Sequence, residues 1–441
     1  MRIYLNTLGC ARNLVDSEVM AAAIMTSGAQ MTQDPADADA IVVNTCSFIE
    51  SAINESVDTI LALAVYKKTG NCRRIIVTGC LPERFGEEIA TAIPEVDIFL
   101  GTGAYDQITD AIAGRFGAGT CLLPPPASRP LPTRAAGRNP STHPMAYLKI
   151  GDGCNRHCTY CVIPKLRGRL RSRAAADILT EAEDIAAQGF KEIVLIAQDT
   201  SAYGLDLTPR QSLADLLDRL AGILPGTRIR FLYGSPDHTD AELIATVAKH
   251  PAVAPYFDLP VQHVSARVLK RMGRQYAEPQ LLQLFENIRA AVPGAVLRTT
   301  LLVGFPGETE SDFNELLEFL ETVQFDHAGV FVYSDAEDLA SHNLPDHVPP
   351  DVAQARYERL MTRQAEISLE KNQNRIGKTY AVLVEDRIDD NLYIGRAAFQ
   401  APEVDGIIYI ESPDLTSGDF VDIRITEAYA YDLKGEPEWP V

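Results

Sequence analysis

Short apolar runs alternate with helical patterns along the first part of the chain. Four apolar runs are long enough to form buried strands: residues 2–5, 40–43, 74–78 and 97–100. Three segments between these runs repeat apolar positions at helical spacing: residues 16–29, 54–66 and 87–92. Because strands and helices alternate at this spacing, the pattern predicts a parallel α/β sheet of the doubly wound type.

The same alternation resumes in the middle of the chain. Six apolar runs predict further strands: residues 147–150, 192–197, 230–233, 256–260, 297–303 and 329–333. Helical patterns lie between them, for example at residues 174–188, 213–220 and 279–291. Six strand–helix units are too few to close an eight-stranded barrel. We therefore expect a partial (β/α)6 barrel, an open crescent whose site lies at the carboxyl ends of its strands.

The last part of the chain changes from a helical to a strand pattern. A long helix is predicted over residues 352–373, and several short strands are predicted after Gly377. These strands are residues 380–384, 392–396, 407–410 and 420–425. Several short strands in so short a segment predict a small β-barrel. Residues 375–441 hold 14 acidic and 6 basic side chains, which gives this barrel a net charge of −8.

Proline marks the boundary between the first two patterns. Residues 117–144 contain a cluster of prolines: Pro124, Pro125, Pro126, Pro130, Pro132 and Pro140. Proline disrupts regular helices and central strands, so this segment is predicted to be a linker or a surface strap. The predicted domains are residues 1–116, 145–373 and 374–441, with the linker between the first two.

Composition narrows the class of protein without identifying a reaction. The 441 residues are enough for about two to four domains, and no apolar run approaches the length of a membrane span. The first residues do not resemble a signal peptide, so we expect a cytoplasmic protein. Eight cysteines in such a chain favour metal or redox chemistry over a disulfide framework. The net charge of −20 repels nucleic acid and favours basic protein partners, although simple solubility also explains it.

Three cysteines lie close together directly after the first strand of the central pattern. Cys154, Cys158 and Cys161 have the spacing C-x3-C-x2-C, and their soft thiolates suit zinc or an iron–sulfur cluster. Structural zinc normally takes four protein ligands, so a zinc site would need His157 as the fourth. Three ligands instead suit a [4Fe-4S] cluster whose open iron can chelate S-adenosylmethionine (SAM). A chance cluster of buried or free thiols is the other alternative.

A second set of cysteines follows three predicted strands of the first domain. Cys10, Cys46 and Cys80 each lie just past the carboxyl end of a strand. The ends of parallel strands share one edge of a sheet, where open α/β folds place their ligands. The spacing therefore predicts a second three-cysteine cluster, against the alternative of three unrelated buried cysteines. Cys72 and Cys121 have no such placement and are interpreted as spare thiols.

Polar or glycine-containing segments follow other strands of the central pattern and are predicted to point into the same mouth. These segments are residues 198–204, 258–263 and 304–308. Gln198, Gly304 and Glu308 are the candidate SAM-binding residues, although each segment could equally be a plain turn, and His263 is interpreted as a packing residue. Residues 165–173 carry five basic side chains, which form either a solvated face or a site for a carboxylate or phosphate.

Taken together, these three parts resemble the radical-SAM methylthiotransferases over the whole chain. That family joins an N-terminal cluster domain, a radical-SAM crescent and a C-terminal TRAM barrel in this order. The cysteines match its auxiliary-cluster ligands and its SAM-cluster ligands, respectively: Cys10, Cys46 and Cys80, and Cys154, Cys158 and Cys161. Residues 9–18, 198–204 and 344–347 look like the RimO branch of the family.

The resemblance implies a reaction, its cofactors and its partners. The RimO branch methylthiolates the β-carbon of an aspartate in the twelfth protein of the small ribosomal subunit, so that basic protein, or the whole subunit, is the implied substrate. The implied cofactors are two [4Fe-4S] clusters and SAM, with a sulfur source and an electron donor such as flavodoxin. One SAM would give the 5′-deoxyadenosyl radical that takes hydrogen from an unactivated carbon, and a second would methylate the sulfur. No membrane partner is implied, and direct nucleic-acid binding is not expected to dominate.

Alternatives stay open from the sequence. The nearest is the sister branch, which makes 2-methylthioadenosine in transfer RNA, and which a basic rather than an acidic barrel would favour. A non-catalytic iron–sulfur or zinc protein would leave a SAM-sized crescent unexplained. A methyltransferase without sulfur insertion would leave the first three cysteines unexplained. The turn at residues 335–338 is more acidic than the family pattern leads us to expect, and no catalytic side chain is assigned.

Overall fold

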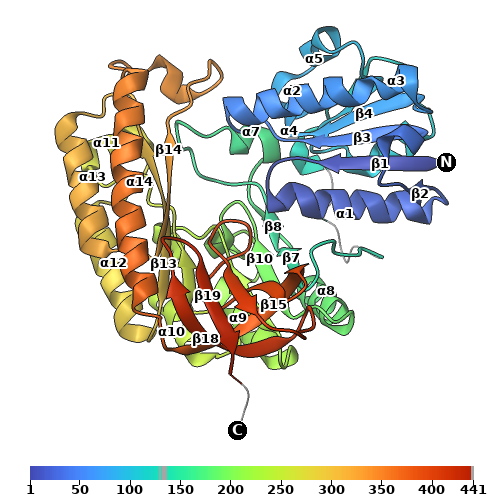
Figure 1. Cartoon of the computed structure of the whole chain (residues 1–441). Coiled ribbons are helices and arrows are strands. Elements are labelled where there is room, and N and C mark those ends of the chain that lie inside the picture. The colour runs from blue at the N-terminus through green and yellow to red at the C-terminus, as the bar shows by residue number, and fades with distance from the viewer. Residues whose placement is uncertain (129–130, 132–136, 439–441) are drawn as a thin grey trace.

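The computed structural model describes residues 1–128, 131 and 137–438, and it begins with an N-terminal sheet (Figure 1). This sheet has six parallel strands in the order β2-β1-β3-β4-β5-β6. Its strands are β1 (Arg2–Thr7), β2 (Gln30–Met31), β3 (Ala40–Thr45), β4 (Arg74–Gly79), β5 (Ile98–Leu100) and β6 (Thr120–Leu122). Its helices are α1 (Ala11–Thr26), α2 (Glu50–Ala64), α3 (Tyr66–Thr69), α4 (Cys80–Phe85), α5 (Glu88–Ala92) and α6 (Ile108–Ile112). The predicted doubly wound sheet is confirmed.

Both faces of the N-terminal sheet are covered, which explains why its central strands read as unbroken apolar runs. In β3, the side chains of Ile41 and Val43 join a core with Ile60 of α2. Val42, between them, joins a separate core with Met20 of α1. Because alternate side chains of a strand point to opposite faces, a strand between two helical layers needs apolar residues at successive positions.

The N-terminal sheet differs from the prediction at its short elements. β2 has two residues and β6 has three, and neither is long enough to show a periodic pattern. Strand β6 lies inside residues 117–144 and pairs with β5, so the predicted linker begins with a strand of the sheet. Pro130 and Pro132, which also belong to the predicted linker, lie outside the described residues. Helix α1 begins at Ala11 rather than at residue 16, because its first turns bury polar side chains that an apolar pattern does not count.

The central crescent contains six parallel strands in two three-stranded sheets, β11-β10-β7 and β12-β13-β14. Its strands are β7 (Met145–Lys149), β10 (Glu192–Ile196), β11 (Arg228–Phe231), β12 (Tyr256–Asp258), β13 (Val296–Val303) and β14 (His327–Val332). A bridge between Ile229 and Val253 continues the curve from β11 toward β12. The six predicted strands are all present, and they form the partial (β/α)6 barrel.

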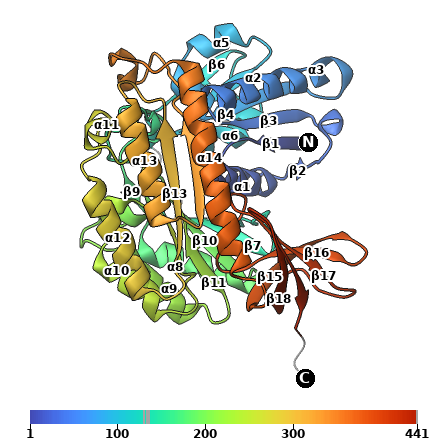
Figure 2. The same ribbon diagram turned by 60° about the vertical axis from the view of Figure 1, so that its left-hand side comes forward.

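Helices cover the outer side of the crescent (Figure 2). They are α8 (Ala175–Ala187), α9 (Leu213–Ile223), α10 (Ala241–Lys249), α11 (Ala266–Arg271), α12 (Glu278–Ala291) and α13 (Glu310–Val323). The loop after β7 carries short elements: β8 (Gly151–Asp152), α7 (Ile163–Arg167) and β9 (Arg171–Ser172). Short 3-10 turns occur at Pro35–Asp37, Tyr105–Gln107, Pro126–Ser128, Thr200–Ala202, Pro236–His238 and Ala340–Asn343. Within the described part of the chain, no helix combines the length and the apolarity needed to cross a membrane.

Helix α14 (Pro350–Gln373) leads from the crescent to a closed five-stranded C-terminal barrel in the order β15-β16-β17-β19-β18. Its strands are β15 (Thr379–Asp389), β16 (Leu392–Arg396), β17 (Ile408–Glu411), β18 (Phe420–Ala428) and β19 (Leu433–Pro437). The barrel is confirmed. Strand β19 was not predicted, because Leu433 is its one large apolar side chain; it closes the barrel by pairing with β17 and β18.

The barrel closes one side of the crescent, as Figure 1 shows. Val194 of β10 packs in the same apolar cluster as Val382 of β15. A buried charge network crosses the same junction, where Glu192 of β10 accepts hydrogen bonds from Arg230 of β11 and Arg396 of β16. The barrel is therefore joined to the crescent by both apolar and ionic contacts.

Candidate active site

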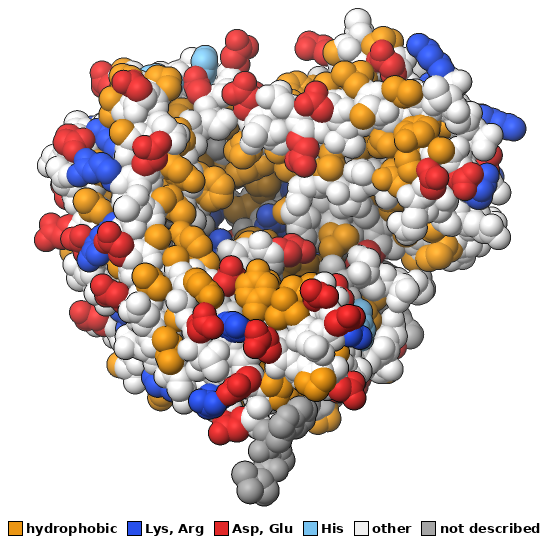
Figure 3. All heavy atoms as spheres, viewed as in Figure 1, with side chains coloured by type: hydrophobic (Ala, Val, Ile, Leu, Met, Phe, Trp, Pro, Cys, Tyr) orange, Lys and Arg blue, Asp and Glu red, His pale blue; other side chains and the backbone are white. Residues whose placement is uncertain are grey.

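A cavity of about 630 Å³ lies where the N-terminal sheet meets the carboxyl ends of the crescent strands. The residues that line it include all six cysteines predicted as ligands: Cys10, Cys46, Cys80, Cys154, Cys158 and Cys161. Figure 3 shows a hollow in the middle of the molecule, bordered largely by hydrophobic side chains. Cysteines that are far apart in the sequence thus meet around one space.

The cysteines of the N-terminal sheet form a first trio at the ends of three adjacent strands. Cys10 follows β1 and precedes α1, Cys46 follows β3, and Cys80 begins α4 directly after β4. The turn before Cys10 packs directly on Cys46, because Gly9 has a φ of +90° and a Cβ added there would lie 2.6 Å from the Cβ of Cys46. Glycine is the residue that fits this turn, and it brings two predicted ligands together.

Burial and nearby arginines give the thiols of the first trio different pKa values. Burial opposes ionisation of Cys10, but the guanidinium of Arg12 and other donors lower the pKa of this thiol to about 7. At Cys80 burial dominates and raises the pKa to about 11, although Arg167 opposes it. Burial also raises the pKa of Cys46. The thiolate form that binds iron is therefore easiest to reach at Cys10.

Arg167 of α7 connects the first trio to the crescent. It donates hydrogen bonds to Asp16 at 2.7 Å and to Asn13 at 2.6 Å, both on α1, and its Nη2 lies 3.8 Å from the Sγ of Cys80. Lys149 of β7 donates to the other carboxylate oxygen of Asp16 at 2.6 Å. These charged groups are buried, so each needs its partner in the interface. Arg167 belongs to the predicted basic run, and it binds a carboxylate of the protein itself.

Glu18, further along α1, binds the segment that leads into the crescent. It accepts hydrogen bonds from the Nε of Arg138 at 2.9 Å and from the backbone N–H of Ser141 at 2.7 Å. Arg138 also pairs with Glu181 of α8 at 2.5 Å. The described end of the predicted linker is therefore a buried connection between the N-terminal sheet and the crescent.

The second trio lies on the loop between β8 and α7. The backbone N–H of Cys154 donates to the carbonyl of Gly168 at 3.0 Å, and the N–H of Thr159 donates to the carbonyl of Met272 at 3.1 Å. Burial raises the pKa of Cys154, and it raises the pKa of Cys161 to about 12, where the neighbouring thiols add to the effect. The loop is thus fixed from both sides before any cofactor binds.

The donor sets fit iron–sulfur clusters. The members of each trio line the same cavity, and neighbouring thiols raise the pKa of Cys80 in the first trio and of Cys161 in the second. His157, which a zinc site would need, is exposed and is not among the residues that line the cavity. Three thiols around open space suit a cluster that keeps one iron for another ligand.

Gln198 lines the cavity, whereas His263 does not. The Nε2 of Gln198 donates to Asp152 at 2.8 Å, and its Oε1 is buried without a hydrogen-bond partner among the described residues. His263 is fully buried, and its Nδ1 accepts from the backbone N–H groups of Val264 at 2.9 Å and Ser265 at 3.1 Å. Gln198 therefore keeps a free acceptor, and His263 stabilises the backbone of its own turn.

Gly304 and Glu308 lie outside the cavity lining. Gly304 has a φ of +76°, and a Cβ added there would lie 2.5 Å from the Cβ of Ala353 on α14. Glu308 accepts from the backbone N–H groups of Gly304 and Phe305, and it pairs with Arg356 of α14 at 3.4 Å. Both residues stabilise the turn before α13 against α14. Their predicted contact with SAM stays a prediction that this arrangement does not support.

The acidic turn at residues 335–338 connects the crescent to the N-terminal sheet. Asp338 pairs with Arg84 of α4 at 2.6 Å and with Lys165 of α7 at 3.2 Å. Asp335 accepts a hydrogen bond from the hydroxyl of Tyr333 at 2.8 Å. The unexpected acidity of this turn is therefore explained by the basic residues that it meets beside the cavity.

Sequence analysis missed two residues at the centre of the cavity. Arg12 of α1 donates to the carbonyl of Ala197 at 2.9 Å, its Nε lies 3.4 Å from the Sγ of Cys10, and its guanidinium lies 4.4 Å from the centre of the Tyr233 ring. Tyr233 has a φ of 62°, which is uncommon for a residue with a bulky side chain. No sequence pattern predicts the contact between Arg12 and Tyr233, because the two residues belong to different parts of the chain.

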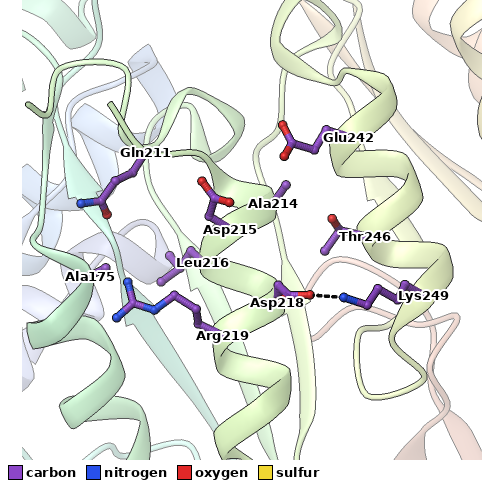
Figure 4. Close-up of a pocket in the computed structure, with 10 residues that line it drawn as sticks. All are labelled: Ala175, Gln211, Ala214, Asp215, Leu216, Asp218, Arg219, Glu242, Thr246 and Lys249. Carbon is purple, nitrogen blue, oxygen red and sulfur yellow. Dashed lines mark hydrogen bonds and ion pairs between the residues drawn. The ribbon is translucent and has the colours of Figure 1, made fainter. Parts of the chain in front are cut away.

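A second hollow, of about 510 Å³, lies on the outer helices of the crescent (Figure 4). Its charged lining residues are Asp215, Asp218, Arg219, Glu242 and Lys249. Asp218 and Lys249 pair across it at 2.5 Å. None of the cysteines lines this hollow, and its charges of both signs lie on exposed helix faces, so the chemistry is assigned to the cavity that the cysteines line.

The fold and the two cysteine trios are those expected of one class of enzyme, the radical-SAM methylthiotransferases that the sequence resembles. Comparisons with known families agree with this class. Residues 148–320 match the Radical SAM superfamily, and residues 376–437 match the TRAM domain. Residues 2–101 match a family that is described as uncharacterized protein family UPF0004.

Known relatives span the whole chain. The ribosomal protein uS12 methylthiotransferase RimO of Desulfosudis oleivorans is 52% identical over 440 residues, which cover 99% of this chain and 100% of the relative. The protein of the same name from Clostridioides difficile is 45% identical over 99% of this chain and 98% of the relative. The chain belongs to the family of ribosomal protein uS12 methylthiotransferases RimO.

Solved structures of other radical SAM enzymes share the fold. The methyltransferase TsrM from Kitasatospora setae aligns with a TM-score of 0.58 and 13% identity, over 88% of this chain and 79% of that one. The cobalamin-dependent radical enzyme OxsB aligns with a TM-score of 0.53 and 14% identity, over 84% of this chain and 56% of that one. At such low identity the likeness concerns the fold alone.

Proposed function

We propose that this chain, a radical-SAM methylthiotransferase by its family, adds a methylthio group to the β-carbon of an aspartate in ribosomal protein uS12. The observation that carries the proposal is the single cavity lined by both cysteine trios. A substrate carbon held between the trios would be within reach of the group that removes hydrogen and of the group that donates sulfur. The names of the relatives support uS12 as the substrate.

The trios are assigned as ligands of two [4Fe-4S] clusters. The SAM-binding cluster takes Cys154, Cys158 and Cys161, and the auxiliary cluster takes Cys10, Cys46 and Cys80. When bound, the clusters and SAM supply one-electron chemistry, hydrogen removal from an unactivated carbon, and a sulfur atom with its methyl group. Arg12 and Arg167 place positive charge beside the first trio, which favours its thiolates. The free Oε1 of Gln198 offers an acceptor for an N–H group of SAM.

Apolar side chains wall much of the cavity. They include Ile49, Ala52, Ile163, Pro164, Leu166 and Phe331. Such walls exclude water and offer few polar groups that could react with an intermediate. The polar side chains of the lining, among them the arginines and Gln198, are the groups that can orient a polar substrate.

The acidic barrel supports a basic protein as the substrate. Residues 375–441 carry a net charge of −8, which attracts a basic protein and repels RNA. The barrel is therefore assigned to recognition of uS12, free or within the small ribosomal subunit. The proposed setting is the cytoplasm, with a sulfur source and a soluble electron donor such as flavodoxin. The proposed functional units are residues 1–116, 145–373 and 374–441.

The proposal is tested with the reconstituted enzyme under anaerobic conditions. The mixture contains SAM, a reductant, sulfide and purified uS12, and a parallel mixture contains transfer RNA instead. We expect the intact mass of uS12 to increase by a methylthio group in place of hydrogen, and fragmentation to locate it on an aspartate. Methylthioadenosine in the RNA beside unmodified uS12 would contradict the proposal and assign the chain to the sister branch. Neither product, with SAM intact, would contradict the enzymatic assignment.

A further inference from the structure

The cavity is lined by four arginine side chains that differ in how their charge is neutralised. They are Arg12, Arg156, Arg167 and Arg274. Arg156 pairs with Asp199 at 3.1 Å, and Arg167 pairs with Asp16 at 2.7 Å. Arg12 and Arg274 have no carboxylate partner within the described ranges. Two cations in the cavity therefore lack a carboxylate of the chain itself, although the Nε of Arg12 also contacts the Sγ of Cys10.

The two arginines without a carboxylate partner face different trios. Arg274 donates to the hydroxyl of Tyr160 at 2.8 Å and interacts with the thiol of Cys158, which places it at the second trio. Arg12 uses Nη1 for the carbonyl of Ala197 and Nε for the Sγ of Cys10. No partner of its Nη2 is present in residues 1–128 or 137–438. Arg12 therefore keeps free N–H donors on the side of the first trio.

Arg12 is held between the N-terminal sheet and the crescent. It belongs to α1, two residues after Cys10, but its hydrogen bond to Ala197 and its stacking on Tyr233 are both made to the crescent. Stacking covers the flat face of the guanidinium and leaves its N–H groups at the edge free to bind. These contacts hold the guanidinium in the lining of the cavity that both trios share.

We propose that Arg12 binds the side-chain carboxylate of the target aspartate, an inference that rests on the proposed function. A carboxylate that enters a cavity loses water and needs a paired, hydrogen-bonded cation. The guanidinium matches a carboxylate through two parallel N–H donors, and this geometry fixes the direction of the bond from the carboxylate carbon to the β-carbon. Arg12 would therefore both neutralise the substrate and aim the reacting carbon.

A carboxylate-binding role of Arg12 would also make the enzyme prefer aspartate to asparagine. The two side chains have nearly the same shape, so walls of apolar residues cannot distinguish them. A site that pairs a cation with a charged group rejects a neutral analogue because the cation then remains desolvated and unpaired. The preference between the two substrates thus reports directly on the partner of Arg12.

The test compares wild-type enzyme with the Arg12→Gln and Arg12→Lys variants on two substrates. One is uS12, and the other is uS12 with its target aspartate replaced by asparagine. For Arg12→Gln we expect kcat/KM on uS12 to fall by roughly 10- to 100-fold, with little change on the asparagine form, because a hydrogen-bonded charge pair is lost. Arg12→Lys should keep part of the preference for aspartate, since it keeps the positive charge but loses the two parallel N–H donors of the guanidinium.

The control variant is Arg219→Gln, which removes an exposed arginine that lines the outer hollow of Figure 4. It should behave like the wild type. Iron and sulfide content and SAM cleavage without uS12 are measured for every variant. These readouts are needed because the Nε of Arg12 lies 3.4 Å from the Sγ of Cys10, a predicted cluster ligand. They separate a loss of the cluster from a loss of substrate binding.

Two results would overturn the inference. One is an Arg12→Gln enzyme that keeps the wild-type preference for aspartate. The other is an equal loss on both substrates together with a loss of iron, which would restrict Arg12 to supporting Cys10. Failure of the proposed function looks different, because the wild-type enzyme itself would then leave uS12 unmodified.

Discussion

Single residues determine how the first trio is presented to the cavity. The φ of Gly9 and its lack of a side chain let the turn of Cys10 pack on Cys46. The guanidinium of Arg12 then helps to lower the pKa of Cys10 to about 7, against the effect of burial. The first trio therefore depends on residues that are not ligands.

The importance of the Gly9 turn can be measured with a matched pair of glycine variants. Gly9 and Gly28 have φ values of +90° and +88°, but an added Cβ meets Cys46 at the first site and nothing within 4 Å at the second. We expect Gly28→Ala to cost about 1 kcal/mol of backbone strain. Gly9→Ala should cost about 1–3 kcal/mol more from overpacking and should lose iron from the first trio. Denaturant midpoints and iron content check this, and equal values for the two variants would contradict it.

The two trios should fail in different ways when one ligand is removed. Cys158→Ala should lose iron and abolish SAM cleavage, because it removes a proposed ligand of the SAM-binding cluster. Cys46→Ala should also lose iron but should retain SAM cleavage while giving no methylthio product. Deoxyadenosine and the mass of uS12 are measured in the same reactions. Methylthio product from Cys46→Ala, or SAM cleavage by Cys158→Ala, would refute the corresponding assignment.

At the residue scale, the sequence predicts which cysteines meet around the cavity, whereas their roles as ligands stay predictions and the residues around them are not visible in it. The six cysteines are visible because strand ends and close spacing are local properties of the sequence. The contact of Arg12 with Tyr233 is not visible, since it depends on how α1 meets β11 after folding. Gly304 and Glu308 stay predictions as SAM-binding residues; the structure shows their turn packed against α14.

At the element scale, an apolar run decides which strands could be predicted: β5 and β12 have only three residues, yet their apolar side chains are part of predicted strands. The strands β3, β4, β10 and β13 have five to eight residues and long apolar runs, and each was found. The short strands β2 and β6, with the sequences Gln-Met and Thr-Cys-Leu, have no such run, so they pair with their neighbours without leaving a pattern. The topology of the parallel sheets can be predicted from the alternation of strands and helices. Strand β19 could not be predicted, because it is defined by its pairing with β17 and β18 rather than by an apolar run.

The acidic turn after β14 provides a test at the same scale. Asp338→Asn removes the charge that meets Arg84 and Lys165. Because Asp338 is partly exposed, we expect a loss of no more than about 1 kcal/mol in unfolding free energy. Amide exchange in residues 334–343 should nevertheless become faster. Glu337→Gln is the control within the same turn, and equal exchange in both variants would contradict the role of Asp338.

At the scale of the whole molecule, buried charge joins the barrel to the crescent. Burial opposes ionisation of Glu192, but Arg396, Arg230 and Arg228 lower its pKa to about 2. The carboxylate of Glu192 is therefore charged at neutral pH, and it accepts hydrogen bonds from Arg230 of the crescent and Arg396 of the barrel. Since the pKa is lower in the folded chain than its ordinary value of 4.5, ionised Glu192 stabilises the folded state above pH 4.5.

The contribution of Glu192 should disappear in acid. As the pH falls from 4.5 toward 2, protonation of the unfolded chain removes the stabilisation that this carboxylate provides. Glu192→Gln should cost about 3–5 kcal/mol at pH 7, because it leaves buried arginines unpaired, and the difference from wild type should shrink below pH 4.5. Urea unfolding at pH 7, 5 and 4 checks this. Exposed Glu411→Gln is the control, and a constant difference across these pH values would refute the prediction.

Arg167 also bears on the order in which the enzyme matures. During synthesis the residues of the N-terminal sheet leave the ribosome well before α7 does. Once that sheet folds, Cys10, Cys46 and Cys80 lie on an edge that the crescent does not yet cover. We expect a carrier to deliver the auxiliary cluster most easily in this interval, before Arg167 docks beside Cys80. An enzyme that modifies a ribosomal protein would then receive one of its two clusters while it is still a nascent chain on a ribosome.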